Sequence, residues 1–134
     1  MDKDKAFIFP ALRYKNANAA IGWLEKAFGF ERLMVVPGEN GGVAHAELKI
    51  GAGVVMLGEG PDAGGSERSK DPSVGAGLYL YVPNVEAAFE RAKGAGAEIV
   101  RELQDTDYGS REFSALDLEG NIWSFGSYVP EGMD

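Results

Sequence analysis

His45 and Glu47 are the two residues whose types and spacing best suit proton transfer. They lie two positions apart in the alternating segment 43–50, so on a β-strand both side chains point to the same face. A carboxylate beside an imidazole orients the ring and can accept its proton, which suits general acid–base chemistry near neutral pH. We therefore treat the pair as the catalytic candidates. Two alternatives stay open: contact with a ligand without catalysis, and a solvated strand face.

Aromatic residues form a second candidate group, suited to binding rather than to reaction. In the segment 77–82, strand alternation turns Tyr79 and Tyr81 away from the leucines that would face the core. With two N-terminal phenylalanines these rings could form a wall for a planar or cationic ligand, or they could be filler on a half-buried sheet face. The predicted ligand-facing set is Phe7, Phe9, Arg13, His45, Glu47, Met56, Tyr79, Tyr81, Glu112, Ser114 and Ser124.

The composition disfavours several classes of function. The chain has 134 residues, 45% of them hydrophobic and 25% charged, which is the profile of an ordinary globular domain. Its 13 basic and 21 acidic residues give a net charge of -8, so we expect no nucleic acid as a partner. The absence of cysteine excludes thiolate catalysis and cysteine metal sites, and one histidine cannot build a multi-histidine metal centre. Because no stretch of about 18 apolar residues occurs and the N-terminus has no secretory pattern, we expect no membrane association and a cytoplasmic location.

Two helices and eight strands are expected to position the candidate residues. A helix over 17–28 has apolar residues at helical spacing, with Asn16 or Asn18 as its N-cap and Gly29 as its left-handed end. A second helix over 85–93 also follows an asparagine. Strands are expected over 6–14, 30–36, 43–50, 54–58, 77–82, 97–103, 111–117 and 121–128.

The order of these elements repeats halfway along the chain. Tyr14 and Tyr81 are 67 positions apart, and the same offset aligns further identical residues across the two helices, although chance similarity between amphipathic helices is an alternative. We expect an α+β fold in which two paired βαβββ modules form a curved mixed sheet with a concave ligand site. The expected organisation is one domain over 1–134, with modules 5–58 and 77–128 joined by a linker 59–76.

Three segments of the chain resemble a known family. They are residues 12–30, which include Ala-Ala-Ile-Gly-Trp-Leu-Glu-Lys-Ala-Phe-Gly-Phe, residues 80–88, and residues 117–125, Asp-Leu-Glu-Gly-Asn-Ile-Trp-Ser-Phe. They resemble the vicinal oxygen chelate superfamily, which contains glyoxalase I, the bleomycin resistance proteins and the extradiol dioxygenases. The last segment resembles the family's Asp-Pro-x-Gly-Asn turn, with Leu118 where proline is usual. The resemblance implies the paired-module fold but not one function, since isomerases, dioxygenases, transferases and passive drug binders share that fold.

The resemblance also implies where a metal would be held. Enzymes of the family usually bind one divalent metal in the concavity, through the first and last strands of each module. The corresponding positions here are approximately Phe9, Met56, Gly77 and Ser124. The first three side chains cannot ligate a hard cation and serine alone is a poor ligand, so we expect no metal and no cofactor.

The expected function follows from this missing ligand set. The metal-lacking branch of the superfamily includes the bleomycin resistance proteins, and the resemblance implies a metal-independent homodimer that sequesters a cationic or aromatic organic small molecule. A glyoxalase-like lyase or isomerase is the alternative, with His45 and Glu47 as proton carriers and Arg13 stabilising negative charge. An interaction subunit without a ligand is a third possibility.

Overall fold

The same order of strands and helix occurs twice in the computed structural model, which describes residues 6–60 and 77–132. The first run is β1 (Ala11–Tyr14), α1 (Ala17–Phe28), β2 (Glu31–Pro37), a short 3₁₀ turn (Glu39–Gly41), β3 (Val43–Ile50) and β4 (Gly53–Glu59). The second run is β5 (Leu78–Tyr81), α2 (Val85–Gly94), β6 (Glu98–Asp105), β7 (Arg111–Leu116) and β8 (Ile122–Gly126). Glu59, expected in the linker, ends β4 instead, and the rest of that linker from 61 to 76 lies outside the described residues.

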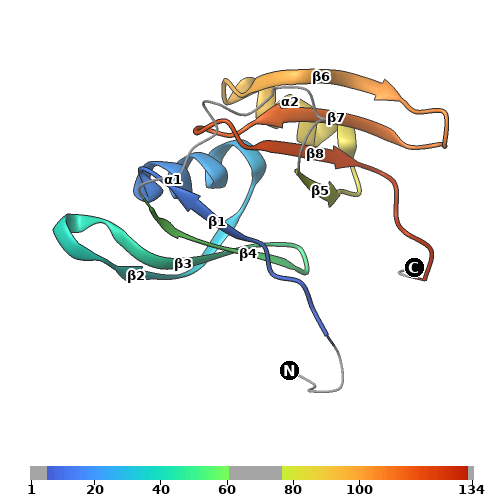
Figure 1. Ribbon diagram of the computed structural model, residues 1–134. Coiled ribbons are helices and arrows are strands. Elements are labelled where there is room, and N and C mark those ends of the chain that lie inside the picture. The colour runs from blue at the N-terminus through green and yellow to red at the C-terminus, as the bar shows by residue number, and fades with distance from the viewer. Residues whose placement is uncertain (1–5, 61–76, 133–134) are drawn as a thin grey trace.

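Each run folds into a four-stranded mixed sheet, as Figure 1 shows. The strand orders are β1-β4-β3-β2 and β5-β8-β7-β6, with β1 parallel to β4, β5 parallel to β8 and the other pairs antiparallel. The prediction of two βαβββ modules is therefore confirmed. The ladders of the described residues form two separate sheets, and β1 is shorter than expected because residues 6–10 precede its ladder.

The local signals for the helices act as the sequence predicts. The side chain of Asn16 accepts a hydrogen bond from the backbone N–H of Ala19, and Asn84 caps α2 in the same way. Gly29 ends α1 with a φ of 85°, in the left-handed region that favours glycine. No helix in the described part of the chain is long and apolar enough to cross a membrane.

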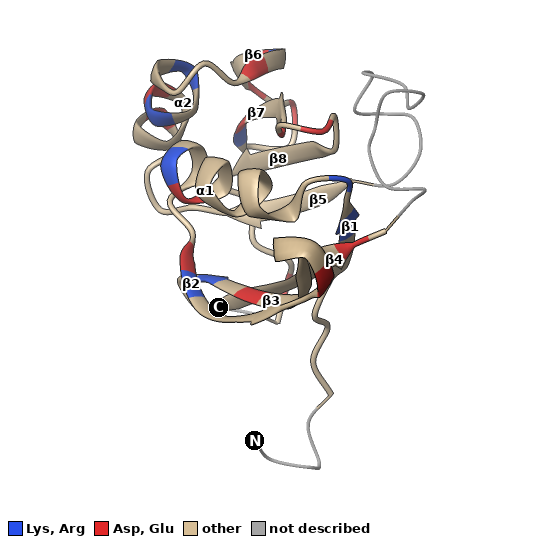
Figure 2. Ribbon diagram, turned by 90° about the vertical axis from the view of Figure 1, so that its left-hand side faces the viewer, with Lys and Arg blue, Asp and Glu red and all other residues tan. Residues whose placement is uncertain are grey.

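The two modules share one hydrophobic core. Phe28 at the end of α1 packs against Trp123 and Phe125 of β8, with ring centroids 5.5 and 4.9 Å apart. The helices lie side by side (Figure 2), and the Arg91 guanidinium of α2 donates hydrogen bonds to the last carbonyls of α1. A cation at that end of a helix also complements the helix dipole. The first module therefore buries part of its apolar surface against the second.

A buried carboxylate completes the junction between the modules. Asp117, only 6% exposed, accepts hydrogen bonds from the hydroxyl of Tyr14 (2.6 Å), the indole N–H of Trp123 (3.0 Å) and the backbone N–H of Asn121 (3.0 Å). Burial, and then the negative charge of Asp117, raise the pKa of Tyr14 well above its usual value. Two residues further on, Glu119 accepts hydrogen bonds from the backbone N–H groups of Lys15 and Asn16, directly before α1. The turn 117–121 of the second module thus holds the β1–α1 junction of the first.

Replacing Tyr14 with phenylalanine is expected to lower the free energy of unfolding by about 2 kcal/mol, because it removes a hydrogen bond to a buried charged group. Tyr81→Phe is the matched control, since Tyr81 occupies the equivalent position of the repeat but is 53% exposed. We expect that control to change stability by less than about 0.5 kcal/mol. Urea denaturation measures both variants, and equal effects at the two positions would contradict the role given to the Tyr14–Asp117 contact.

Candidate functional site

A pocket of about 610 Å³ lies on the face of the β5–β8 sheet that points away from the helices. On β7 and β8, Phe113 and Phe125 point to the core, so the alternating residues Glu112 and Ser124 point to the opposite face. The volume is in the range of small-molecule sites. The pocket is lined by Gly77, Leu78, Tyr79, Arg101, Tyr108, Glu112, Ser124 and Tyr128.

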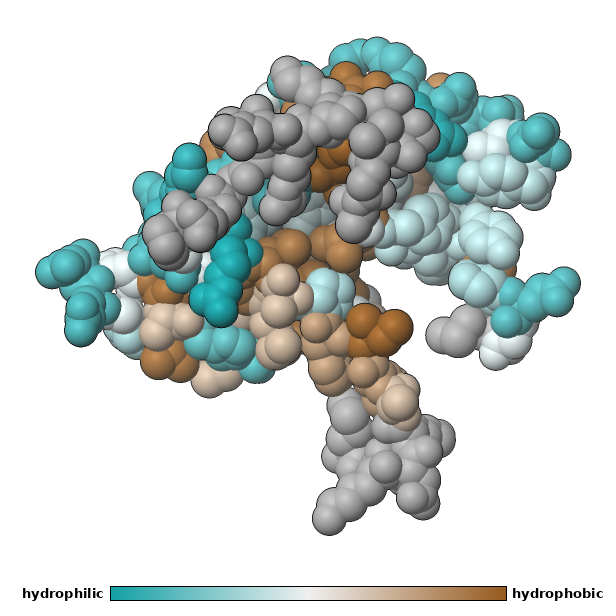
Figure 3. All heavy atoms as spheres, in the orientation of Figure 1, coloured by the Kyte–Doolittle hydropathy of each residue, from teal (hydrophilic) through white to brown (hydrophobic). Residues whose placement is uncertain are grey.

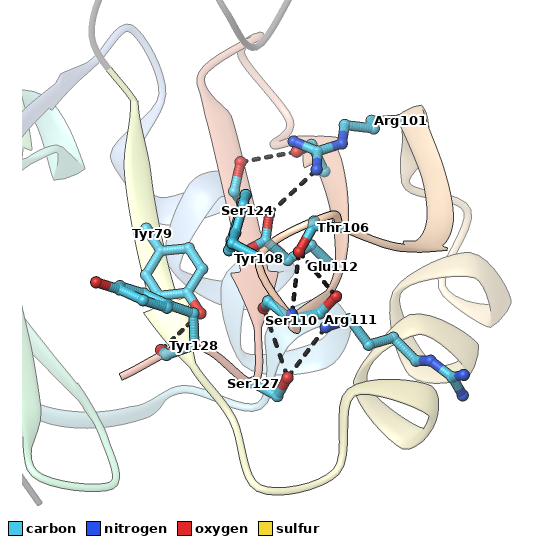
Figure 4. Close-up of polar contacts among 11 residues, drawn as sticks. Tyr79, Arg101, Thr106, Tyr108, Ser110, Arg111, Glu112, Ser124, Ser127 and Tyr128 are labelled. Atoms are coloured by element: carbon cyan, nitrogen blue, oxygen red, sulfur yellow. Dashed lines mark hydrogen bonds and ion pairs between the residues drawn. The ribbon is translucent and has the colours of Figure 1, made fainter. Parts of the chain in front are cut away.

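Glu112 is the polar centre of this pocket. Its side chain is 7% exposed, and its Oε1 accepts hydrogen bonds from Arg101 Nη2 (3.1 Å) and from the hydroxyl of Tyr108 (2.8 Å), as Figure 4 shows. A buried carboxylate needs such partners because its desolvation is costly. The hydrogen bond to Glu112 is also the main reason why the pKa of Tyr108 is raised. The three side chains form one connected network along one side of the pocket.

Tyrosine rings form the other side of the pocket. The hydroxyl of Tyr79 donates a hydrogen bond of 2.8 Å to the backbone carbonyl of Tyr128, and the rings of Tyr108 and Tyr128 meet edge to face at 5.9 Å. Burial, followed by the charge of Glu112, raises the pKa of Tyr79. Tyr79 and Tyr108 thus both donate their phenol protons within the protein. What they can offer to a ligand is the flat face of each ring and the phenol oxygen as a hydrogen-bond acceptor.

Gly126 allows these side chains to lie against β8. A Cβ built at this position would be 2.7 Å from both the hydroxyl of Tyr79 and Cγ of Glu112. Such distances are too short for real contacts, so any larger residue would push the tyrosine or the glutamate out of place. The missing side chain of Gly126 is therefore part of the shape of the pocket.

Tyr108 and Tyr128 lie outside the ladders, and hydrogen bonds of adjacent residues hold the segments that carry them. The β6–β7 turn that carries Tyr108 is closed by the backbone N–H of Thr106, which donates to the carbonyl of Ser110 at 2.7 Å. The segment that carries Tyr128 follows β8, and Ser127 fixes it by accepting the backbone N–H that begins β7 at 3.0 Å. A turn and a strand extension thus supply two of the three tyrosines.

The pocket contains some of the residues predicted from the sequence. Tyr79, Glu112 and Ser124 line it, and Ser114 is buried beside it with its Oγ 2.7 Å from that of Ser124. Tyr81 lies on β5 outside the lining. The remaining candidates belong to the first module and do not line this pocket: Phe7, Phe9, Arg13, His45, Glu47 and Met56.

His45 and Glu47 do share a face of β3, as their spacing predicts. Nε2 of His45 lies 2.9 Å from Oε2 of Glu47, and both side chains are partly exposed, 41% and 32%. The pair is available for hydrogen bonding or proton transfer at the surface of the first sheet. It is separate from the lining of the pocket in the second module.

Sequence reasoning missed Arg101, Tyr108 and Tyr128. Irregular register on both sides of Arg101 interrupts the alternation along β6. The face to which the Arg101 side chain points could therefore not be predicted from its spacing. Tyr108 belongs to a turn, where alternation does not apply. Tyr128 had a usable signal, because continuing the alternation of β8 from Ser124 reaches Gly126 and then Tyr128.

The donor groups do not fit the divalent metal that the resemblance implies. Of the four corresponding positions, Gly77 and Ser124 line the pocket, but glycine offers no side chain and the serine hydroxyl is hydrogen-bonded to Ser114. The single carboxylate in the lining, Glu112, is bound to Arg101 and Tyr108. Within residues 6–60 and 77–132, no three His, Cys, Asp or Glu side chains are grouped so that they could hold a metal ion.

Comparisons with known proteins agree with this architecture. An uncharacterised protein of Mycobacterium bovis is 36% identical over 126 residues, which cover 91% of this chain and 83% of that protein. Among solved structures, TioX from Micromonospora sp. ML1 is 30% identical with a TM-score of 0.73, over 93% of this chain and 100% of that one. The fosfomycin resistance protein FosX from Listeria monocytogenes, solved with Mn(II) and sulfate, has a TM-score of 0.70 at 15% identity, over 95% of each chain, and this likeness shows the fold alone.

A family model places the chain by sequence as well. The model described as Glyoxalase/Bleomycin resistance protein/Dioxygenase superfamily matches residues 7–125, which span both modules and the turn at 117–121. The chain belongs to the glyoxalase/bleomycin resistance protein/dioxygenase superfamily.

Proposed function

We propose that this protein binds an organic small molecule, cationic or aromatic, without a metal, and holds it in the pocket of the second module. The observation that carries the proposal is the 610 Å³ pocket whose wall consists of three tyrosines beside the buried carboxylate of Glu112. A pocket of this kind binds through stacking and desolvation, with a few polar groups that fix the orientation of the ligand. Sequestration of the ligand needs no further chemistry.

A lyase or isomerase activity is the second candidate function. The 2.9 Å contact between His45 Nε2 and Glu47 Oε2 favours it, because a carboxylate beside an imidazole is a proton-transfer pair. Such a reaction also needs a group that stabilises developing negative charge. Arg13, the residue expected in that role, contacts the backbone carbonyl of Glu59 at 3.5 Å, so this candidate has weaker support than the pocket.

A homodimer is part of the proposal. Apolar side chains are exposed along the N-terminal segment where it projects from the body of the molecule (Figure 3), among them Phe7 (58%) and Ile8 (91%). Leu33 and Met34 on the edge strand β2 are also largely exposed. A second copy of the chain could cover such surface, which is costly to leave in water.

The first test is a thermal-shift screen of protein treated with EDTA, with planar aromatic compounds in one arm and divalent metals in the other. A bound compound at about 100 times its dissociation constant is expected to add about 2.7 kcal/mol, which raises Tm by roughly 8 °C for a domain of this size. Tyr128→Ala should weaken that binding about tenfold through the loss of ring contact. Tyr81→Ala is the matched control and should leave binding unchanged, because Tyr81 is an exposed tyrosine of β5 outside the pocket lining.

The screen also separates the two candidate functions. Stabilisation by a divalent metal, with no organic compound effective, would contradict metal-independent binding and would put the His45–Glu47 enzyme first. Stabilisation by an organic compound that is equally strong in Tyr128→Ala would move the binding site away from this pocket.

The shape of the pocket gives a second test, at Gly126. Gly126→Ala is expected to displace Tyr79 or Glu112, to lower the free energy of unfolding by about 1–3 kcal/mol and to weaken the compound found in the screen. Gly22→Ala in α1 is the control, because its new Cβ would meet nothing within 4 Å and alanine favours the helix by roughly 1 kcal/mol. Urea denaturation should therefore show a lower free energy of unfolding for Gly126→Ala and a higher one for Gly22→Ala. Wild-type stability and binding in Gly126→Ala would contradict the close approach at β8.

Light scattering tests the homodimer. We expect a mass of about twice the 14.3 kDa of one chain, because the exposed apolar residues of the N-terminal segment and β2 would be covered by a second copy. A mass equal to one chain at micromolar concentration would exclude the dimer.

A further inference from the structure

The hydrogen bonds of Glu112 are unevenly divided between its two oxygens. Oε1 accepts from both Arg101 and Tyr108, whereas Oε2 accepts no hydrogen bond from the described residues. Within the described part of the chain, no fully buried side-chain oxygen or nitrogen lacks a partner, so Oε2 is not sealed off from solvent. Because Glu112 is 7% exposed and lines the pocket, this open oxygen is an acceptor for a ligand.

Arg101 provides donors beside this acceptor. Its Nη2 is 3.1 Å from Glu112 Oε1, and Tyr108 is its other neighbour in this network. A guanidinium has several N–H groups, and the side chain is 32% exposed at the pocket, so donors remain for a ligand. An acceptor of Glu112 and a donor of Arg101 therefore stand next to each other (Figure 4).

The same ion pair sets the charge that the pocket tolerates. The positive charge of Arg101 offsets the negative charge of Glu112, and the other lining residues are uncharged tyrosine, serine, leucine and glycine. A cationic ligand would have to compete with Arg101 for the carboxylate or lie beside a like charge. An anionic ligand that paired with Arg101 would likewise lie beside the negative charge of Glu112. The electrostatics of the pocket favour a neutral ligand.

From these contacts we infer that the pocket selects a neutral, flat aromatic molecule that carries an N–H donor next to a carbonyl acceptor, as an aromatic lactam or amide does. The N–H of the ligand donates to Oε2 of Glu112, its carbonyl accepts from Arg101, and its ring lies against Tyr79 and Tyr128. This inference rests on the proposed function and narrows it, because it prefers neutral aromatic compounds over cationic ones.

Three compounds of nearly equal size test this selection. Carbostyril is a neutral lactam with the required donor and acceptor, N-methylcarbostyril lacks the donor, and N-methylquinolinium is a cation that lacks both. Calorimetric titration of the full chain, supported by shifts of the tyrosine NMR signals, is expected to show carbostyril binding at least about tenfold tighter than either of the others. N-methylcarbostyril loses the hydrogen bond to Glu112, and N-methylquinolinium loses the hydrogen bonds to both Glu112 and Arg101.

Two variants identify the groups responsible. Glu112→Gln should reduce the preference for carbostyril over its N-methyl derivative to less than about twofold. Glu102→Gln is the matched control, because Glu102 is an exposed glutamate next to Arg101 in sequence and the substitution makes the same change in net charge. This control should keep the wild-type preference for carbostyril. Arg101→Met leaves the charge of Glu112 without its partner, so N-methylquinolinium should bind about tenfold tighter than it does to the wild type. Circular dichroism and Tm verify folding, and if Glu112→Gln does not fold, the gain for the cation in Arg101→Met remains as the test.

The outcomes separate this inference from the proposed function. Equal binding of the three compounds, or tightest binding of the cation to the wild type, overturns the selection for a neutral lactam but leaves a small-molecule pocket. Failure of carbostyril where another aromatic compound binds has the same meaning. Failure of every aromatic compound to shift the signals of the pocket tyrosines overturns both.

Discussion

The buried carboxylate of Asp117 is the constraint on which the rest of the structure depends. A charged group with so little access to water must find several donors, and here they come from both modules: Tyr14 from the first, Asn121 and Trp123 from the second. Satisfying one carboxylate therefore fixes how the modules meet. Because β8 begins directly after this turn, the same requirement sets the register of Ser124 and Gly126, and with it the floor of the pocket.

The elements were predictable from sequence because their signals are local. Asn16 needs only the next turn of chain to act as a cap, and Gly29 ends its helix by its own conformational freedom. Burial was not predictable in the same way. Tyr14 and Tyr81 occupy equivalent positions of the repeat, yet the first is fully buried and the second is exposed, because only Tyr14 meets a carboxylate from the other module.

The lining of the pocket likewise contains residues that were predictable from sequence and residues that were not. Tyr79, Glu112 and Ser124 lie on regular strands, where a period of two is enough to give the face. The pocket-facing position of Arg101 was not predictable because the pairing of β6 is irregular there, and that of Tyr108 was not predictable because it lies in a turn. Regular strands thus supply the predictable part of the lining. Tyr108 depends instead on the turn 106–110, and the segment of Tyr128 is held through Ser127 by Arg111, 16 positions away in sequence. His45 and Glu47 were correctly assigned to one face, but spacing within one strand says nothing about how far that face lies from a pocket in the other module.

The position of Tyr108 and Tyr128 outside the ladders has a consequence for divergence among relatives. Neither side chain belongs to the shared core, and each is carried by a segment outside the strand ladders. Substitutions at these two positions can alter which compound fits without disturbing Asp117 or the packing of Phe28 on β8. Selection can then act on ligand preference with little effect on the junction between the modules, which is one physical route by which a single scaffold comes to serve many unrelated small molecules.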